Sequence, residues 1–544
     1  MPYAPQPPSK TGFTERQIVL GLITIFSVNV GLNFLINTLG IARPRMAAEL
    51  NGMSIYAWSL SIPGLAAAFA TLLFSKFSDM YGRRIMLLIC MVLFLAGTVW
   101  SALAPTFAIL IAANTLSRFG NGALAPLCYS VLGDMLEPVR RSRWVGLLHI
   151  PQGCFALFGP TLGGWFVDNL SWRYLYWMGV PLLLLGLFMV PVGIPVSSRR
   201  VSRKIDVRGM LLVAVGSSAT ILGFSFAGTM FPWGSVQVVG LLTLGLVFWV
   251  LFFRAEGRAD EPILDPQVFR NRTFLTVAVA GMLSFFGLMA MMMYYPMFLQ
   301  GVQGMSVMRS GYIITPFSVL MAFVGVPTGF LIARYKRYKW MYIMGYGLLT
   351  AVLFGTVFFD SRTPAAVEFL AALLAGLGLG TIPTVNTLVV QYAVPKRLLG
   401  ASMGAIFFSI TMGMAISPAV LGSVMNVSYA RALDANLPSE LQRFADKATM
   451  TALSDPKALL SPDAMKALEK TLKGTGENGE ELFLKTVEGI RKSMEAGLSA
   501  VFLLGAVTML ISFLLIVTVP EVSMDAVVED KKAPQPAVAE KAAV

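Results

Sequence analysis

One arginine stands deep inside a long apolar stretch of the sequence. Arg118 lies about eleven residues into the apolar run from Phe107 to Leu132, and at about 1.5 Å per residue this is near the middle of a membrane-crossing helix. A charge at that depth costs several kcal/mol unless it is paired or hydrated, so intramembrane charges usually serve a function. Arg118 is therefore a candidate functional residue, with a purely structural role as the alternative.

A second group of charges lies between two apolar runs, in "SKFSDMYGRR" from Ser75 to Arg84. Asp79 precedes Arg83 by four residues, Gly82 permits a tight turn, and Arg84 adds a further positive charge. A carboxylate here can pair with Arg83 or face the positive end of another helix. The alternative is an ordinary basic loop that happens to carry one acid.

A third segment, "GPTLGG", places glycines and a proline inside an apolar run, at Gly159, Pro160, Gly163 and Gly164. Helices in lipid keep their backbone hydrogen bonds despite such residues. Small residues four positions apart also let two helices approach closely. Gly159 and Gly163 form such a pair, with Gly164 beside it, so the segment predicts a tight helix–helix contact.

Neutral amides recur in the first apolar run, where Asn29, Asn33 and Asn37 share one helical face. Such side chains hydrogen-bond neighbouring helices within membranes. Alternatively they form a polar stripe that lines a cavity opposite Arg118. Both interpretations remain open at this point.

Few groups in the apolar runs could carry a proton. His149, the only histidine, has an ordinary pKa suited to proton transfer, although a helix-packing role is the alternative. The other candidates are Glu368, near one end of its apolar run, and the acids Asp79 and Asp134 near the ends of theirs.

The elements that position these residues follow from composition. The 544 residues are 56% hydrophobic and 13% charged, whereas soluble proteins carry about 25% charged residues. The apolar residues form blocks of the length that crosses a bilayer, so we predict an all-α polytopic membrane protein. The fourteen predicted spans are Gln17–Leu39, Ala57–Phe74, Ile85–Ala104, Phe107–Leu132, Trp144–Val167, Trp172–Ile194, Met210–Met230, Val236–Phe253, Phe274–Leu299, Gly311–Ala333, Trp340–Phe359, Val367–Tyr392, Ala401–Val427 and Ala496–Val519.

The net charge of +13 is distributed unevenly. Basic clusters fall in every second connection, while the intervening "SALAPTFA" carries no charge. This positive-inside pattern predicts cytoplasmic termini, and it accounts for the basic excess without a nucleic-acid partner. The three cysteines lack disulfide or metal-binding spacing, and no Gly-rich phosphate loop is present. We therefore expect no metal, no cofactor and no enzyme activity.

A polar insert, residues 428–495, interrupts the last third of the chain. We expect a small helical hairpin there, including a capped helix in "SPDAMKALEKTLKG" and a second amphipathic helix in "GEELFLKTVEGIRKSM". Docking of a periplasmic adaptor on this insert is a further hypothesis. The predicted organisation is an N-terminal tail (1–16), a six-helix bundle (17–194), a linker with two extra spans (195–273), a second six-helix bundle containing the insert (274–520), and a C-terminal tail (521–544).

Several of these motifs resemble those of the major facilitator superfamily. "SKFSDMYGRR" resembles its signature loop, Arg118 in "LSRFGNGALAP" its buried arginine, and "GPTLGG" the fifth-span motif of its antiporters. Other stretches, such as "LAGLGLGTIPTVNTLVVQYAVP", are similar to the fourteen-span drug:proton antiporter branch over nearly the whole chain.

The resemblance implies a fold of two six-helix bundles plus two linking helices, in the inner (plasma) membrane. It also implies export of small lipophilic molecules by alternating access, in exchange for protons. Asp79 and Arg83 would then latch one side of the cavity, Arg118 would line it and relay protons, and the glycine patch would pack across the two halves. An importer or uniporter of the same fold is the alternative, as is a membrane receptor or assembly factor.

Three positions depart from the family pattern. Ser75 stands where the family usually has glycine, and Phe155 stands where the glycine patch usually begins. The first span also lacks the usual acid. Because Arg118 then has no nearby counter-charge, we expect the cavity to favour neutral or anionic lipophilic molecules over cations.

Overall fold

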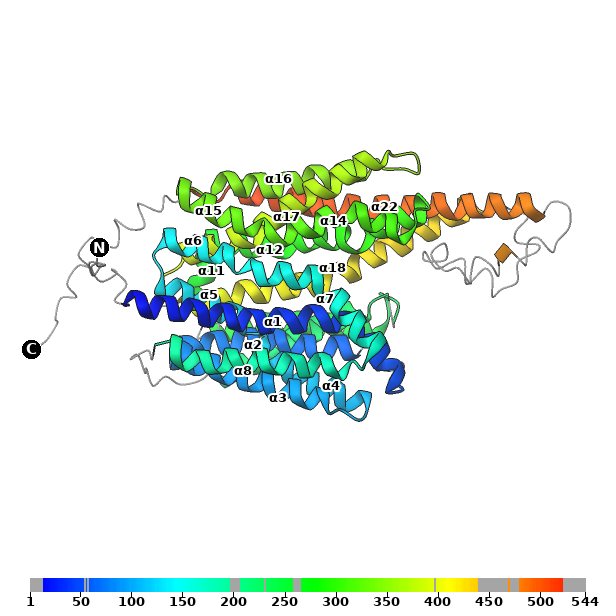
Figure 1. Ribbon diagram of the computed structural model, residues 1–544. Helices are drawn as coiled ribbons and strands as arrows, with labels where there is room; N and C mark the ends of the chain where they lie inside the picture. The colour runs from blue at the N-terminus through cyan, green and yellow to red at the C-terminus, as the bar shows by residue number, and fades with distance from the viewer. Residues whose placement is uncertain are drawn as a thin grey trace, which may run out of the picture.

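The computed structural model describes residues 13–52, 55, 58–195, 206–228, 231–257, 266–395, 398–438, 468–469 and 479–521. Over these residues the chain is almost entirely helical, and its long helices run side by side (Figure 1). The described part holds no β-strand, only one isolated bridge between Ala227 and Phe231. The prediction of an all-α protein is confirmed.

The first half of the chain forms one group of helices, called here the first bundle. Its helices pack on one another through the pairs α1–α8, α1–α7, α3–α4 and α2–α4. Their bounds are α1 Glu15–Glu49, α2 Trp58–Tyr81, α3 Arg83–Ala102, α4 Phe107–Asn121, α5 Leu124–Met135, α6 Pro138–Leu147, α7 His149–Asn169 and α8 Arg173–Gly193.

Two further helices, α9 (Val207–Phe226) and α10 (Val236–Glu256), lead into the second bundle. The second bundle packs through α12–α18, α14–α17, α16–α17 and α18–α22. Its elements are α11 Pro266–Arg270, α12 Arg272–Met289, the π-helix η2 Ala290–Tyr294, α13 Tyr295–Met297, the π-helix η3 Phe298–Val302, α14 Val307–Phe323, α15 Gly325–Tyr335, α16 Lys339–Thr356, α17 Ala365–Ala393, α18 Leu399–Asn436 and α22 Gly479–Val517.

Local sequence explains where several helices begin. The side chain of Thr14 accepts a hydrogen bond from the Gln17 amide at 3.3 Å, and the Gln17 side chain accepts one from the Thr14 amide at 2.9 Å. This reciprocal capping satisfies donors that the first turn leaves unpaired. Single side-chain caps open other helices, at Thr106, Asp206, Ser235, Asn271 and Ser306.

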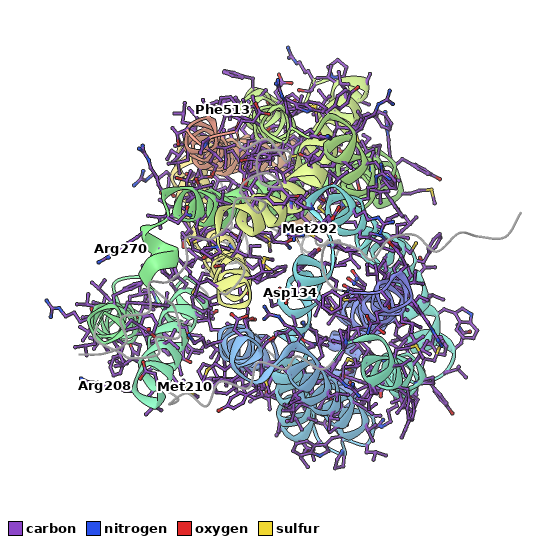
Figure 2. The ribbon with its side chains drawn as sticks, turned by 90° about the vertical axis from the view of Figure 1, so that its left-hand side faces the viewer. Asp134, Arg208, Met210, Arg270, Met292 and Phe513 are labelled. Atoms are coloured by element: carbon purple, nitrogen blue, oxygen red, sulfur yellow. The ribbon has the colours of Figure 1, made fainter. Side chains whose placement is uncertain are left out.

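Two ends of the molecule can be told apart. We call the end at which α1 begins and α22 finishes the proximal end, and the opposite end, beyond which α18 and α22 extend as a pair, the distal end (Figure 1). Seen from the proximal end, the two bundles lie against each other with Asp134 near their junction, and α9, marked by Arg208 and Met210, lies at one edge (Figure 2). There α9 packs against both α2 and α18.

Within the described residues, nine helices are long and apolar enough to cross a membrane, or as many as eleven if each bent pair is one span. The expected all-helical polytopic architecture is therefore present, but the count of fourteen is not confirmed. Several predicted spans are divided, among them Phe107–Leu132 between α4 and α5, Trp144–Val167 between α6 and α7, and Gly311–Ala333 between α14 and α15. The second of these bends by 43° between Gly159 and Thr161, since proline cannot donate to the helix ladder.

The insert differs from the expected separate hairpin at both of its edges. Helix α18 continues past the predicted span end at Val427 to Asn436, and "GEELFLKTVEGIRKSM" is the first part of the long helix α22. The two extensions pack together, with Gly489 held close to the Asn436 carbonyl. Most of the predicted helix "SPDAMKALEKTLKG" lies outside the described residues.

Candidate functional site

A network of charges joins the two bundles at the proximal end. Arg83 Nη1 lies 2.5 Å from Asp79 Oδ1, and Arg83 Nε lies 2.9 Å from Asp134 Oδ2. The Asp79 carboxylate also accepts hydrogen bonds from the backbone amides of Gly400 at 3.1 Å and Ala401 at 2.7 Å. Because these amides open α18, Asp79 of the first bundle caps a helix of the second, where the helix dipole favours a negative charge.

The turn that carries this network is set by glycine. Gly82 separates α2 from α3 with φ of 100°, a conformation that other residues rarely adopt. Arg84 follows on α3 and is half-buried, with no hydrogen-bond or ion-pair partner among the described residues. Asp79, Gly82 and Arg83 are thus brought together as their spacing predicts, whereas Arg84 stands outside the network.

The serine that departs from the family pattern is accommodated by the facing helix. Ser75 is buried on α2 and faces Gly404 of α18. If Gly404 carried a side chain, its Cβ atom would lie only 2.5 Å from the Ser75 Cβ, too close for two carbon atoms. A Cβ at Gly400 would likewise overlap the Asp79 carboxylate. Close packing between α2 and α18 is therefore kept by glycines on α18. These glycines were not predicted, because nothing in the loop after α2 indicates which helix faces it.

A second glycine contact closes the proximal end on the other side of the interface. A Cβ at Gly329 of α15 would overlap the Ser142 carbonyl of α6, and one at Gly146 would lie 2.7 Å from the Gly325 carbonyl. The two backbones touch directly, as small residues permit. The signal for this contact, Gly325 and Gly329 four residues apart, is present in the sequence but was not recognised there.

His149 also spans the interface. Its Nε2 lies 3.0 Å from Thr384 Oγ1 of α17, and its ring would meet a Cβ at Gly325 of α15. The side chain is 3% exposed. This hydrogen-bonded, buried position matches the helix-packing interpretation and places the contact between the bundles.

The family resemblance implied that the glycine patch packs across the two halves. Instead, Gly159 and Gly163 face α1 of the same bundle. A Cβ at Gly159 would lie 3.0 Å from the Asn37 Cβ, and one at Gly163 would lie 2.5 Å from the Thr38 carbonyl. Phe155 packs edge-on against Phe34 with ring centroids 5.6 Å apart. All three positions share the face of α7 that meets α1 of the same bundle.

The neighbouring positions of the patch contribute differently. A Cβ at Gly164 would meet no atom within 4 Å, so this glycine is not required by packing. The side chain of Pro160 lies outside the described residues. Earlier on α7, a Cβ at Gly153 would lie 3.1 Å from the Ala322 Cβ of α14, and this is where α7 meets the second bundle.

The asparagine stripe is bonded along its own helix. The side-chain amides of Asn29, Asn33 and Asn37 each donate to the carbonyl four residues earlier, at 3.0, 2.9 and 2.9 Å. Each of these amides thus uses one donor within α1, and the three side chains are not among those that line the hollow containing Arg118.

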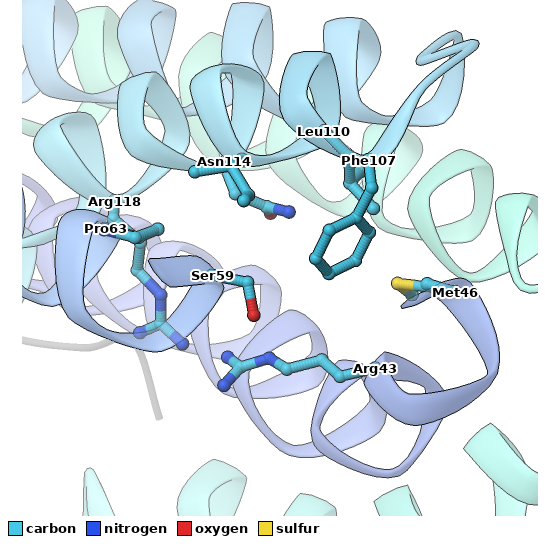
Figure 3. Close-up of a pocket in the computed structure, with 9 residues that line it drawn as sticks. Arg43, Met46, Ser59, Pro63, Phe107, Leu110, Asn114 and Arg118 are labelled. Carbon is cyan, nitrogen blue, oxygen red and sulfur yellow. The ribbon is translucent and has the colours of Figure 1, made fainter. Parts of the chain in front are cut away.

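Arg118 instead lies beside a second arginine. The hollow, between α1, α2 and α4, is lined by Arg43, Ser59, Asn114 and Arg118 together with apolar side chains (Figure 3). Arg43 was not singled out from the sequence, because it follows the expected end of its span. Only the packing of the first-bundle helices brings the two charges together.

Glu368 is a buried acid of the second bundle. It is fully buried near the start of α17, and neither carboxylate oxygen has a hydrogen-bond partner among the described residues. Its backbone carbonyl accepts a hydrogen bond from the Tyr295 hydroxyl at 2.8 Å. Burying an acid without hydrogen-bond partners costs free energy, and intramembrane acids of this kind typically mark an ion pathway.

A larger cavity lies between the bundles on the distal side of these contacts. It measures about 350 Å³ and separates Ala156 and Leu157 of α7 from α14 and the preceding Gln300. Its walls are formed by uncharged side chains, some apolar and some polar. Among the polar ones, the Gln300 amide donates a hydrogen bond to the Ser310 hydroxyl at 3.0 Å. The size and lining are typical of sites for small organic molecules.

The described residues show no group of three His, Cys, Asp or Glu side chains able to hold a metal ion. The site thus consists of a charged, glycine-packed closure at one end, a neutral cavity between the bundles, a half-buried arginine pair in the first bundle and a buried acid in the second.

Sequence comparison finds transporters among the relatives of this chain. The chain is 28% identical over 444 residues to the multidrug transporter protein MdtP of Bacillus subtilis, covering 79% of this chain and 81% of that protein. It is 24% identical over 424 residues to multidrug resistance protein 3 of the same organism, covering 77% and 81%.

Solved structures share the fold at low sequence identity. The proton:xylose symporter XylE superposes with a TM-score of 0.57 at 13% identity, covering 94% of this chain and 99% of that one. The human organic anion transporter MFSD10 superposes with a TM-score of 0.58 at 14% identity, covering 94% and 100%.

The sequence profile described as Major Facilitator Superfamily matches residues 22–418, most of the chain. Proteins of this family are transporters rather than enzymes. With the paired helix bundles and the charged closure between them, this match shows that the chain belongs to the major facilitator superfamily.

Proposed function

We propose that this protein exports small lipophilic molecules across the plasma membrane by alternating access, in exchange for protons. The observation that carries the proposal is the asymmetry of the bundle interface. The proximal end is closed by Asp79, Arg83 and backbone amides of α18, whereas the 350 Å³ cavity lies against the distal half of the bent α14–α15 span. The low-identity relatives named as multidrug transporters support the same direction and class of transport.

Orientation and span number form part of this proposal. We propose fourteen spans, the two-bundle division given above and cytoplasmic termini, with the proximal end facing the cytoplasm. The basic clusters of the loops support this orientation. The described state then has its cytoplasmic side closed.

For the coupling ion we propose the proton, with Glu368 as its carrier. The first span holds no acid, His149 is engaged by Thr384, and Asp79 is engaged by Arg83 and α18. Glu368 is buried, titratable and without a hydrogen-bond partner among the described residues. Buried intramembrane acids in this situation typically serve as proton relays.

The test is transport into everted membrane vesicles with an imposed proton gradient, using a neutral fluorescent lipophilic dye. We expect dye uptake when the vesicle lumen is acidic, and loss of uptake when a protonophore collapses the gradient. Glu368→Gln should abolish gradient-driven uptake, whereas the matched control Glu137→Gln, an exposed glutamate preceding α6, should not.

Three results would contradict the proposal. Gradient-independent equilibration of the dye would indicate a uniporter, and uptake driven by the opposite gradient would indicate an importer. A complete lack of flux together with a stable protein partner would favour the receptor or assembly-factor alternative.

A further inference from the structure

Two guanidinium groups converge in the first bundle, away from the cavity between the bundles. Arg43 on α1 and Arg118 on α4 line one hollow, and both side chains point toward the space beside Ser59 of α2 (Figure 3). Both residues are half-buried. The two charges lie close enough to act on each other electrostatically.

Neither arginine has a counter-charge in the part of the chain that the structure describes. The acid nearest in sequence to Arg43, Glu49, already pairs with Arg45 at 3.2 Å and accepts a hydrogen bond from Trp172 Nε1 at 2.7 Å. Asn114, the amide in the hollow, accepts from the Tyr176 hydroxyl at 3.2 Å.

Two like charges in this position repel each other, and the repulsion grows as water is excluded. Arginine cannot relieve it by losing its proton, because the guanidinium group stays charged at any physiological pH. An anion placed between the two guanidinium groups offsets the repulsion and accepts charge-assisted hydrogen bonds from the N–H donors of both.

The shape of the hollow restricts the anion. Its volume is about 30 Å³, room for a small head group and not for a whole drug-sized molecule. The remaining walls are largely apolar, from Met46, Phe107, Leu110 and Ile111. Such walls favour an alkyl or aromatic tail beside the head group over a fully hydrated inorganic ion.

We propose that Arg43 and Arg118 together bind the carboxylate of an amphipathic organic anion, and that such anions are substrates of this protein. The assignment of substrates rests on the proposed export function, while the binding site itself does not. The pair also gives a reason why no acid stands opposite Arg118: the substrate supplies that charge.

Binding is tested on the purified full-length protein with decanoate as the probe, below its micelle-forming concentration. Decanol has the same tail without charge, decyltrimethylammonium reverses the charge, and acetate and chloride are anions without a tail. We expect decanoate to raise the melting temperature in a concentration-dependent way and the four comparison compounds to have far smaller effects. Stabilisation by chloride or acetate equal to that by decanoate would reduce the site to a counter-ion site, and equal stabilisation by decanol would remove the role of charge.

Variants then assign the effect to the two arginines. Arg43→Gln and Arg118→Gln should each weaken decanoate binding about tenfold or more, the size expected for losing hydrogen bonds to a charged group. Arg43→Lys should fall between wild type and Arg43→Gln, because it keeps the charge and loses the fork. The matched control is Arg45→Gln, on the same helix with a 63% exposed side chain; if it weakens binding as much as Arg43→Gln, the proposal fails.

Flux measurements separate this proposal from the export function. Everted vesicles that accumulate the neutral dye but in which decanoate is neither bound nor transported would overturn the anion site and leave export intact. Arginine-dependent binding of decanoate without gradient-driven flux of any probe would overturn export and the assignment of decanoate as a substrate.

Discussion

At the proximal end the two bundles are joined by charged groups and touching backbones, whereas between α7 and α14 they are separated by a cavity with neutral walls. The proximal contacts suit a closure that must open, because water can replace the hydrogen bonds between Asp79 and the α18 amides when the bundles part. Neutral walls suit a lipophilic cargo, since a bare charge there would raise the cost of removing water. Under the proposed export function, charge serves closure in one region and its absence serves passage in the other.

The strongest test of this comparison prevents the closure itself. Gly329→Leu places a side chain where even a Cβ atom would overlap the Ser142 carbonyl, so α15 and α6 cannot meet. We expect export to be abolished while the protein remains in the membrane, measured by vesicle uptake and membrane abundance.

The control for this change is Gly355→Leu in α16, where an added Cβ meets no atom within 4 Å. It should transport normally. Normal export in Gly329→Leu would show that the α6–α15 contact is not needed for closure.

A smaller effect on export is expected from a substitution in the glycine patch of α7, which is part of neither the proximal closure nor the cavity between α7 and α14. Gly163→Leu must push α7 away from the Thr38 carbonyl of α1, and such overpacking costs about 1–3 kcal/mol. We expect a lower melting temperature and a large loss of export. The adjacent Gly164→Leu, with open space around it, should leave both unchanged; equal damage from the two variants would contradict the α1–α7 contact.

Removing one charge from the closure should reduce export rather than abolish it. Asp79→Asn keeps the shape but loses the ion pair with Arg83 and weakens the cap on α18, while Arg83 retains Asp134. We expect normal membrane abundance and export reduced several-fold. Glu137→Gln, an exposed acid at the same end, serves as control, and full activity in Asp79→Asn would exclude a latch function for this residue.

The smallest effect is expected in the helix pair beyond the distal end. Lys492 pairs with Glu488 at 2.9 Å, but both side chains are largely exposed, and exposed pairs of this kind contribute little. Lys492→Gln should change neither the melting temperature nor export. A clear loss of export would show that the α18–α22 extension takes part in transport.

Much of the fold was predictable because its signals are local. Apolar blocks of membrane-spanning length gave the all-helical class, and the positions of Asp79 and Arg83 on either side of the Gly82 turn predicted that they can pair. Boundaries were harder to predict. The divisions of α4 from α5 and of α6 from α7, and the continuation of α18 and α22 into the insert, depend on how neighbouring helices support or interrupt a segment.

The sequence by itself determined the helical membrane class, the charged turn after α2 and the position of Arg118 within an apolar segment, because each follows from residue types within one stretch of chain. Only the tertiary structure decided what these residues meet. Asp79 finds the amide of Gly400, 321 positions later in the chain, and Arg118 lies beside Arg43. Helices of this kind all bury similar apolar faces, so the choice of partner comes from packing of whole bundles rather than from spacing along the chain.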